Sequence, residues 1–239
     1  MPGRRRDVLI ALSLFAFLTY LYMLFFSGVS HNPDEWFYLA GAQDVVQGNL
    51  AGVSAHGWLF ALLLTPFYLL SMTLPRVGMI QVTALLNVLL TALTASVLFL
   101  CLNELRYGVK SRLFTALAFA LATIAWPHSH YLLREPVTAL MLLISLWGAI
   151  RFWRRPRMGA FVVFALAFAL VLLTKSVAIA LLPFFSLLII VPLLRRWSAS
   201  DPESGVAAHP RLASLAQRAR AWHEASGQRG LSGWLLPVL

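Results

Sequence analysis

Long apolar runs constrain the fold of this chain more than any other feature of its sequence. The longest begin near residues 8, 78 and 158, and the last continues to about residue 194. A helix needs about 20 residues, with a rise of about 1.5 Å each, to cross the hydrocarbon core of a membrane. Only 12% of the 239 residues are charged, about half the share of a typical soluble domain. The sequence therefore predicts an all-α, polytopic membrane protein with about six transmembrane helices.

The basic residues cluster at the ends of these apolar runs. The chain has a net charge of +10, and its Lys and Arg residues lie where the positive-inside rule places cytoplasmic segments. This pattern favours anionic membrane lipids over nucleic acid as partners, because no basic motif with interleaved aromatic residues occurs. Arg4-Arg5-Arg6 precede a first run that is longer than the core of a signal peptide. We therefore expect an uncleaved first span at about 8–28, a cytoplasmic N-terminus and a location in the plasma (inner) membrane.

Residues 29–77 are expected to form the first loop on the outer face. Its first part, 29–56, contains no Lys or Arg, which indicates a non-cytoplasmic segment. The apolar run 57–75 is long enough to cross the membrane, but it contains Pro66. If 57–75 crossed, the basic segment 103–112 would fall outside. We therefore predict that 57–75 forms a re-entrant or interfacial helix pair on the outer face.

The remaining spans follow from run length and charge. They are expected at about 78–102, 113–126 and 136–152. The stretch 158–194 would be roughly 55 Å long as a single helix, which exceeds the thickness of the hydrocarbon core. Basic clusters flank both of its ends, so it is expected to cross twice and to turn near Lys175 at the outer face.

The predicted organisation has three parts. Residues 1–194 form the transmembrane domain. Residues 195–232 form a basic cytoplasmic loop, whose second half has the residue spacing of an amphipathic helix on the inner leaflet. Residues 233–239 open another apolar run that is too short to cross, which indicates the start of a truncated seventh span and an incomplete chain.

Asp34 and Glu35 are the first candidates for chemistry, because charges beside a membrane span are costly unless they are solvated, paired or used. Adjacent side chains on a helix point about 100° apart, so one carboxylate can face a cavity while the other forms a pair or a cap. The structural alternative is a helix start, with Asn32 as N-cap, Pro33 at the first position and the acids in the first turn. The two interpretations do not exclude each other.

Two further charged segments share the predicted outer face. Arg134 and Glu135 open the span at 136–152, and Lys175 lies at the predicted turn. Each has a structural alternative. Arg134 and Glu135 could form an ion pair at the start of a helix, and Lys175 could be a snorkelling lysine, whose aliphatic side chain lies in the membrane while its ammonium group reaches the interface. The functional interpretation is that they bind a phosphate or a sugar.

Histidines raise the question of a metal site. His128-x-His130 is a plausible ligand pair, and Asp34 or Glu35 could complete the site. Solvated loop histidines are the alternative. The single cysteine, Cys101, excludes a disulfide within the chain, and no nucleotide-binding or protease motif occurs.

Several stretches resemble the GT-C glycosyltransferases, polytopic membrane enzymes related to protein O-mannosyltransferases and lipid A aminoarabinose transferases. The stretch "NPDEWFYLAGAQDVVQGN" resembles their first outer loop, with its acidic pair and aromatic-rich helix. Weaker similarities follow in the same order along the chain, over most of residues 1–195. They are "HGWLFALLLTPFYLL", "YLLREPVTALMLLISLWGAIRFWRR" and "LVLLTKSVAIALLPFFSLLII".

The resemblance implies an inverting transferase that moves a hexose or pentose from a polyprenyl-phosphate donor to a lipid, glycan or protein acceptor on the outer face. It implies that Asp34 is the general base and that Glu35 orients the helix or pairs with a cation. Glu135 matches the second acidic position of the family, and Lys175 or Arg134 would neutralise the leaving phosphate. His56 would contribute to substrate binding, although this chain has His56-Gly57 where His-Pro is common. A divalent ion is a possible cofactor, and the sequence does not name the sugar, the acceptor or the oligomeric state.

Two rival functions remain open from the sequence. A secondary transporter or lipid flippase also places charges near the ends of its spans, although charges at the membrane midplane and internal repeats are missing here. An inactive, truncated relative acting as a membrane scaffold is the second rival.

Overall fold

The computed structural model describes residues 2–26, 33–49, 53, 58–74 and 76–200, which contain helices and no strand. The chain divides into a unit of residues Met1–Leu194 and a second unit, Arg195–Leu239; all contacts given below lie in the first. Residues 195–200 of the predicted loop 195–232 are helical; the amphipathic helix predicted in the second half of that loop, and the predicted start of a seventh span at 233–239, lie outside the described residues. The elements are α1 (Pro2–Leu24), α2 (Asp34–Gln47), α3 (Trp58–Thr73), α4 (Met79–Glu104), α5 (Val109–Ala122), α6 (Ala125–His130), α7 (Glu135–Arg154), α8 (Met158–Thr174), η2 (Ser176–Leu181) and α9 (Leu182–Ser200).

Four segments are long and apolar enough to cross a membrane. They are Arg5–Leu24, Met79–Glu104, Glu135–Arg154 and Ser176–Leu194. Helices α3 and α8 are apolar but shorter. The prediction of an all-helical chain with apolar helices of spanning length is confirmed, and the expected total of about six spans stays a prediction.

Two of the predicted segments differ from the structure. The expected helix pair at 57–75 is one helix, α3, which continues through Pro66. Proline removes one backbone N–H from a helix, and here the hydroxyl of the preceding Thr65 donates a hydrogen bond of 2.8 Å to the carbonyl oxygen of Ala61. The span expected at 113–126 is instead the 14-residue helix α5, followed by the separate short helix α6.

Helix α4 forms the centre of the first unit. It packs against α1, α3, α5, α6 and α7, and most of its length is buried, whereas most of α1 and of Ser176–Leu194 is exposed. Two hydroxyl groups of α4 bond back to their own helix, with Thr94 and Ser96 donating to the carbonyl oxygens of Leu90 and Ala92 at 2.7 and 3.0 Å. Such local bonds satisfy hydroxyl groups where neither water nor another helix supplies an acceptor.

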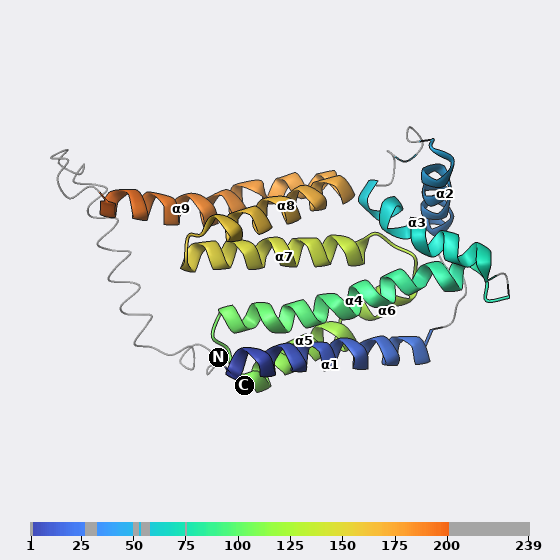
Figure 1. Ribbon diagram of the computed structural model, residues 1–239, viewed down its shortest axis with the longest axis horizontal. Helices are drawn as coiled ribbons and strands as arrows, with labels where there is room; N and C mark the ends of the chain where they lie inside the picture. Colours follow the sequence, from blue (N-terminus) through green and yellow to red (C-terminus); the bar gives the residue numbers. More distant parts are fainter. Residues whose placement is uncertain (1, 27–32, 50–52, 54–57, 75, 201–239) are drawn as a thin grey trace. The chain divides into compact units, whose positions relative to one another are not determined.

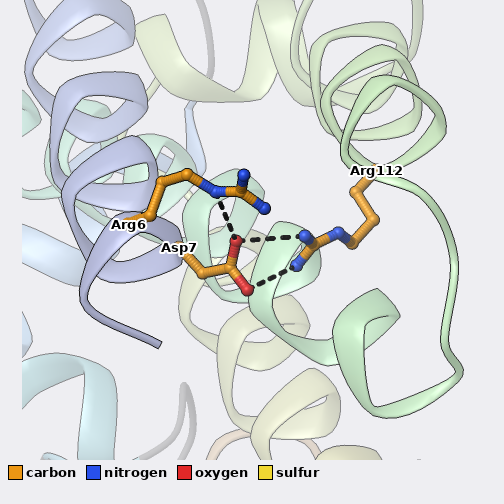
Figure 2. A network of polar contacts seen from close by, with 3 residues as sticks. All are labelled: Arg6, Asp7 and Arg112. Carbon is orange, nitrogen blue, oxygen red and sulfur yellow. Dashed lines mark hydrogen bonds and ion pairs between the residues drawn. The ribbon is translucent and has the colours of Figure 1, made fainter. Parts of the chain in front are cut away.

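The first unit has two chemically different ends. At the arginine end, α1 begins, α4 ends and α7 ends; at the acidic-pair end, α2 and α3 lie near the start of α7 (Figure 1). Arg112 of α5 is buried at the arginine end and donates two hydrogen bonds, of 3.1 and 3.3 Å, to the carboxylate of Asp7 on α1 (Figure 2). The Arg112 guanidinium also lies 4.6 Å from the ring centre of Phe99 on α4. This group ties together α1, α4 and α5.

Candidate functional site

Helix α2 carries the acidic pair and ends where the sequence predicts. Gly48 follows its last residue in a left-handed backbone conformation, with φ of 74°, which glycine adopts without steric cost. At the other end, Pro33 directly precedes Asp34, and the predicted cap Asn32 lies outside the described residues. Asp34 and Glu35 occupy the first turn, where the helix dipole favours negative charge.

The two acids lie in different environments. Glu35 is only 1% exposed, and its Oε1 atom accepts a hydrogen bond of 3.1 Å from the backbone N–H of Leu132. Its Oε2 atom is buried and has no hydrogen-bond partner among the described residues. Asp34 is exposed. Glu35 therefore has the paired role that the helix spacing allows, whereas a cavity that Asp34 faces stays a prediction.

Asn87 fixes the same segment from the opposite side. It is fully buried in α4, and its Nδ2 atom donates to the carbonyl oxygen of Leu133 at 2.8 Å and to that of Tyr131. The backbone between α6 and α7 is thus held by Glu35 through an N–H group and by Asn87 through carbonyl groups. Sequence analysis did not single out Asn87, although a lone amide within a long apolar run is a signal that could have found it.

The start of α7 meets the end of α8 through two polar contacts. The Nζ atom of Lys175 lies 3.4 Å from Oε1 of Glu135, and both side chains are more than a third exposed. Arg134 donates to the carbonyl oxygen of Thr174 at 3.5 Å. Lys175 directly follows α8 in an extended conformation, so the long apolar run is interrupted at this residue as predicted, whereas a turn at the outer face stays a prediction.

Tyr38 on α2 is affected by the charges of both Asp34 and the residues at the start of α7. Burial raises the pKa of its phenol; the charge of Arg134 and a backbone hydrogen bond with Arg134 lower it, whereas the carboxylates of Glu135 and Asp34 raise it. The net direction is upward, so the phenol is neutral at physiological pH. Asp34, Arg134 and Glu135 therefore act on the same phenol.

A cavity of about 210 Å³ lies beside these residues and has Glu135, His128, Thr91 and Thr94 in its wall. The Oε2 atom of Glu135 and the hydroxyl of Thr91 are buried without a hydrogen-bond partner among the described residues. The cavity is smaller than the pockets of about 300–1,000 Å³ that hold most small ligands.

The two histidines proposed as metal ligands lie in different surroundings. The Nδ1 atom of His130 lies 2.9 Å from the carbonyl oxygen of Trp126 and 3.1 Å from the hydroxyl of Ser129. Its ring packs against Phe26 and Tyr22, whereas His128 lines the cavity. Within the described ranges, no three His, Cys, Asp or Glu side chains form a group that could hold a metal ion. The metal site remains a prediction.

The structure gathers most of the charged residues proposed from the sequence at the acidic-pair end. Glu35, Arg134, Glu135 and Lys175 take part in the contacts between α2, α7 and α8 described above. His56 lies outside the described residues, so its proposed role in substrate binding stays a prediction. Comparisons with models of protein families, with curated proteins and with solved structures found no match.

Proposed function

We propose that this protein is a membrane glycosyltransferase that moves a sugar from a polyprenyl-phosphate donor to an acceptor on the non-cytoplasmic face, with inversion at the anomeric carbon. One observation carries the proposal. Acidic and basic side chains from three distant segments, at 34–35, 134–135 and 175, lie at one end of a set of apolar helices, where Glu35 contacts the segment that leads into α7 and Lys175 pairs with Glu135. A lipid-linked phosphate that approaches from the bilayer would lie at this depth, beside the ends of the spans.

The orientation of the site follows from the distribution of basic residues. In the first unit, the basic residues at the arginine end, where α1 and α5 begin and α4 and α7 end, include Arg5, Arg6, Arg106, Lys110, Arg112, Arg151, Arg154, Arg155 and Arg157, whereas Arg76, Arg134 and Lys175 lie at the acidic-pair end. Basic residues concentrate on the cytoplasmic side of membrane proteins. The acidic-pair end is therefore assigned to the outer face.

The chemical step assigns a separate role to each charged group. Asp34, the exposed acid, accepts the proton of the acceptor hydroxyl or amine as that atom attacks the anomeric carbon. The bond between the anomeric carbon and the phosphate oxygen breaks, and its electron pair leaves with the lipid phosphate. Lys175 stabilises the negative charge that develops on that phosphate. Its ion pair with Glu135 is long, at 3.4 Å, and partly exposed, so a phosphate can compete for the ammonium group.

Glu35 acts as a positioning residue in this proposal. Its buried bond to Leu132 holds the first turn of α2 against the backbone that leads into α7. Movement of α2 would displace Asp34 from the acceptor, and displacements of about 1 Å are costly to catalysis.

The test uses the full-length protein in membranes supplied with a panel of radiolabelled polyprenyl-phosphate sugars. Transfer by the wild type that is abolished in Asp34→Asn supports the proposal. Asp44→Asn is the matched control, because Asp44 lies on the same helix and its carboxylate contacts only nearby Asn49 among the bonds shown; it should retain transfer. Undiminished transfer in Asp34→Asn removes this residue from the mechanism, and solute uptake without sugar transfer favours the transporter alternative.

A further inference from the structure

A cavity of about 740 Å³ lies at the arginine end, between α4, α7 and the start of α8, with Asp7 of α1 also in its wall. Its wall contains four arginines, Arg151, Arg154, Arg155 and Arg157, and two acids, Asp7 and Glu104. Its lining residues therefore carry a net charge of +2. None of them belongs to the candidate site at the acidic-pair end.

Both acids in the wall are already engaged. The carboxylate of Glu104 lies 3.2 Å from Nε of Arg151 and 3.9 Å from Nη1 of Arg154. The carboxylate of Asp7 binds the buried guanidinium of Arg112 through two hydrogen bonds. Because Arg112 is not in the wall and Arg151 and Arg154 share one carboxylate, positive charge remains uncompensated, most of it on two other arginines in the wall.

Those arginines are Arg155 and Arg157, for which the described part of the chain supplies no ion-pair partner. Both are exposed, and both have extended backbones in the short link between α7 and α8. Pro156 separates them and cannot continue a helix. Two guanidinium groups are thus presented from one stiff link, and the guanidinium fork matches the oxygen atoms of a phosphate.

Other features of the wall also favour an anion. Gly159, in the first turn of α8, has no atom within 4 Å of the position that a Cβ atom would occupy, so the backbone there is open. Trp147 has a buried indole N–H without an acceptor among the described residues. Its ring lies 4.8 Å from the guanidinium of Arg151, which holds that cation in the wall.

The surroundings of the cavity distinguish a lipid from a free ion. Met158, Val162 and Val163 are large apolar residues that are exposed at the start of α8, and Val163 also lines the cavity. Arginines and apolar side chains thus adjoin at the end of a set of apolar helices. Such basic pockets between membrane helices bind anionic head groups, while the acyl chains lie along the apolar side chains.

We propose that this cavity binds the phosphate group of an anionic membrane lipid, with Arg155 and Arg157 as its principal ligands. The inference does not depend on the proposed glycosyltransferase activity, because the cavity lies at the opposite end of the helices. The arginine end would then have a specific lipid-binding site, beyond the general attraction of its basic residues to anionic lipids.

The test measures binding to the purified full-length protein in an uncharged detergent. The probes are dioctanoyl phosphatidylglycerol, dioctanoyl phosphatidylcholine and inorganic phosphate, each titrated by calorimetry. The wild type should bind phosphatidylglycerol more tightly than the other two probes. The double variant Arg155→Gln/Arg157→Gln should lose about tenfold or more in affinity for phosphatidylglycerol.

The matched control is Arg106→Gln/Lys110→Gln. It removes the same charge from exposed residues at the same end, outside the cavity wall, and should change the affinity by about twofold or less. Equal losses in the two double variants, or no loss in Arg155→Gln/Arg157→Gln, would overturn the proposal. Inorganic phosphate that binds as tightly as phosphatidylglycerol would overturn its assignment to a lipid. If the double variant does not fold, Arg157→Gln alone, with an expected loss of about threefold, still decides the question.

Discussion

The buried carboxylate of Glu35 accepts a hydrogen bond from the backbone N–H of Leu132, 97 residues further along the chain. This contact joins α2 to the segment between α6 and α7. Because Glu35 is buried and its neighbour Asp34 is exposed, the acidic pair combines one buried carboxylate with one at the surface.

Replacement of Glu35 should therefore affect stability more than replacement of Asp34. Glu35→Ala leaves the Leu132 N–H without its acceptor, and a buried donor in this state costs about 1–3 kcal/mol. Glu35→Gln retains an acceptor oxygen and should cost less. Asp34 is exposed, so Asp34→Ala strands no buried group, and the loss of its charge at the helix N-terminus costs about 1 kcal/mol or less. Chemical unfolding in detergent measures all three, and equal stabilities of Glu35→Ala and Asp34→Ala would contradict the division of roles.

The Asp7–Arg112 pair supports a second prediction. Removing one partner of a buried ion pair strands the other charge, at a cost of about 3–5 kcal/mol. Asp7→Leu and Arg112→Met should each destabilise the protein to this extent. The double variant Asp7→Leu/Arg112→Met should be more stable than either single variant, because no charge is then left unpaired. A double-mutant cycle of unfolding free energies tests this, and strictly additive effects would show that the pair does not act as a unit.

Close packing of α7 against α8 gives a third prediction. A Cβ atom on Gly148 would lie 2.7 Å from the backbone nitrogen of Phe164, and a helix backbone cannot move aside as a flexible side chain can. Gly148→Ala should therefore destabilise the protein by about 1–3 kcal/mol. Gly159→Ala is the control, since nothing lies within 4 Å of the new atom and alanine favours helix. The two variants are compared by thermal unfolding, and a Gly148→Ala protein as stable as Gly159→Ala would refute the close contact.

Much of the local structure could be predicted from the sequence. The end of α2 at Gly48 follows from the conformational freedom of glycine, and the break at Lys175 follows from a run too long for one span. Charge and length patterns also predicted that Arg134, Glu135 and Lys175 share an end of the helices. These features depend on neighbouring residues or on the length of an apolar run compared with the thickness of a membrane, and both can be taken directly from the sequence.

The long-range contacts could not be predicted in the same way. The partners of Asn87 and Glu35 are backbone groups, which every residue possesses, so no residue type marks them in the sequence. Asp7 and Arg112 are 105 residues apart, and each resembles an ordinary flanking charge. The continuity of α3 through Pro66 was missed because proline usually disrupts a helix interior, and nothing in the local sequence marks this proline as an exception.

The orientation of the two ends can be checked by cysteine labelling. Trp36 on α2 is exposed, as is Arg106 between α4 and α5. The native Cys101 is buried and should give little background. Trp36→Cys should react with a membrane-impermeant maleimide added to intact cells, whereas Arg106→Cys should react only after permeabilisation. Reaction of both from the same side would contradict the assigned topology, and Cys101→Ala in both backgrounds controls for the native thiol.

Substitution of Lys175 tests whether this lysine, which pairs with Glu135, has a structural or a functional role. Both side chains are partly exposed, and exposed ion pairs contribute only about 0–1 kcal/mol to stability. Lys175→Met should therefore leave thermal unfolding almost unchanged. If Lys175 binds the donor phosphate, the same variant should raise KM for the lipid-linked donor by about tenfold, and Lys175→Arg should restore much of the loss because it retains the positive charge. A Lys175→Met protein that unfolds several degrees earlier but retains the wild-type KM would assign this lysine to the helix junction alone.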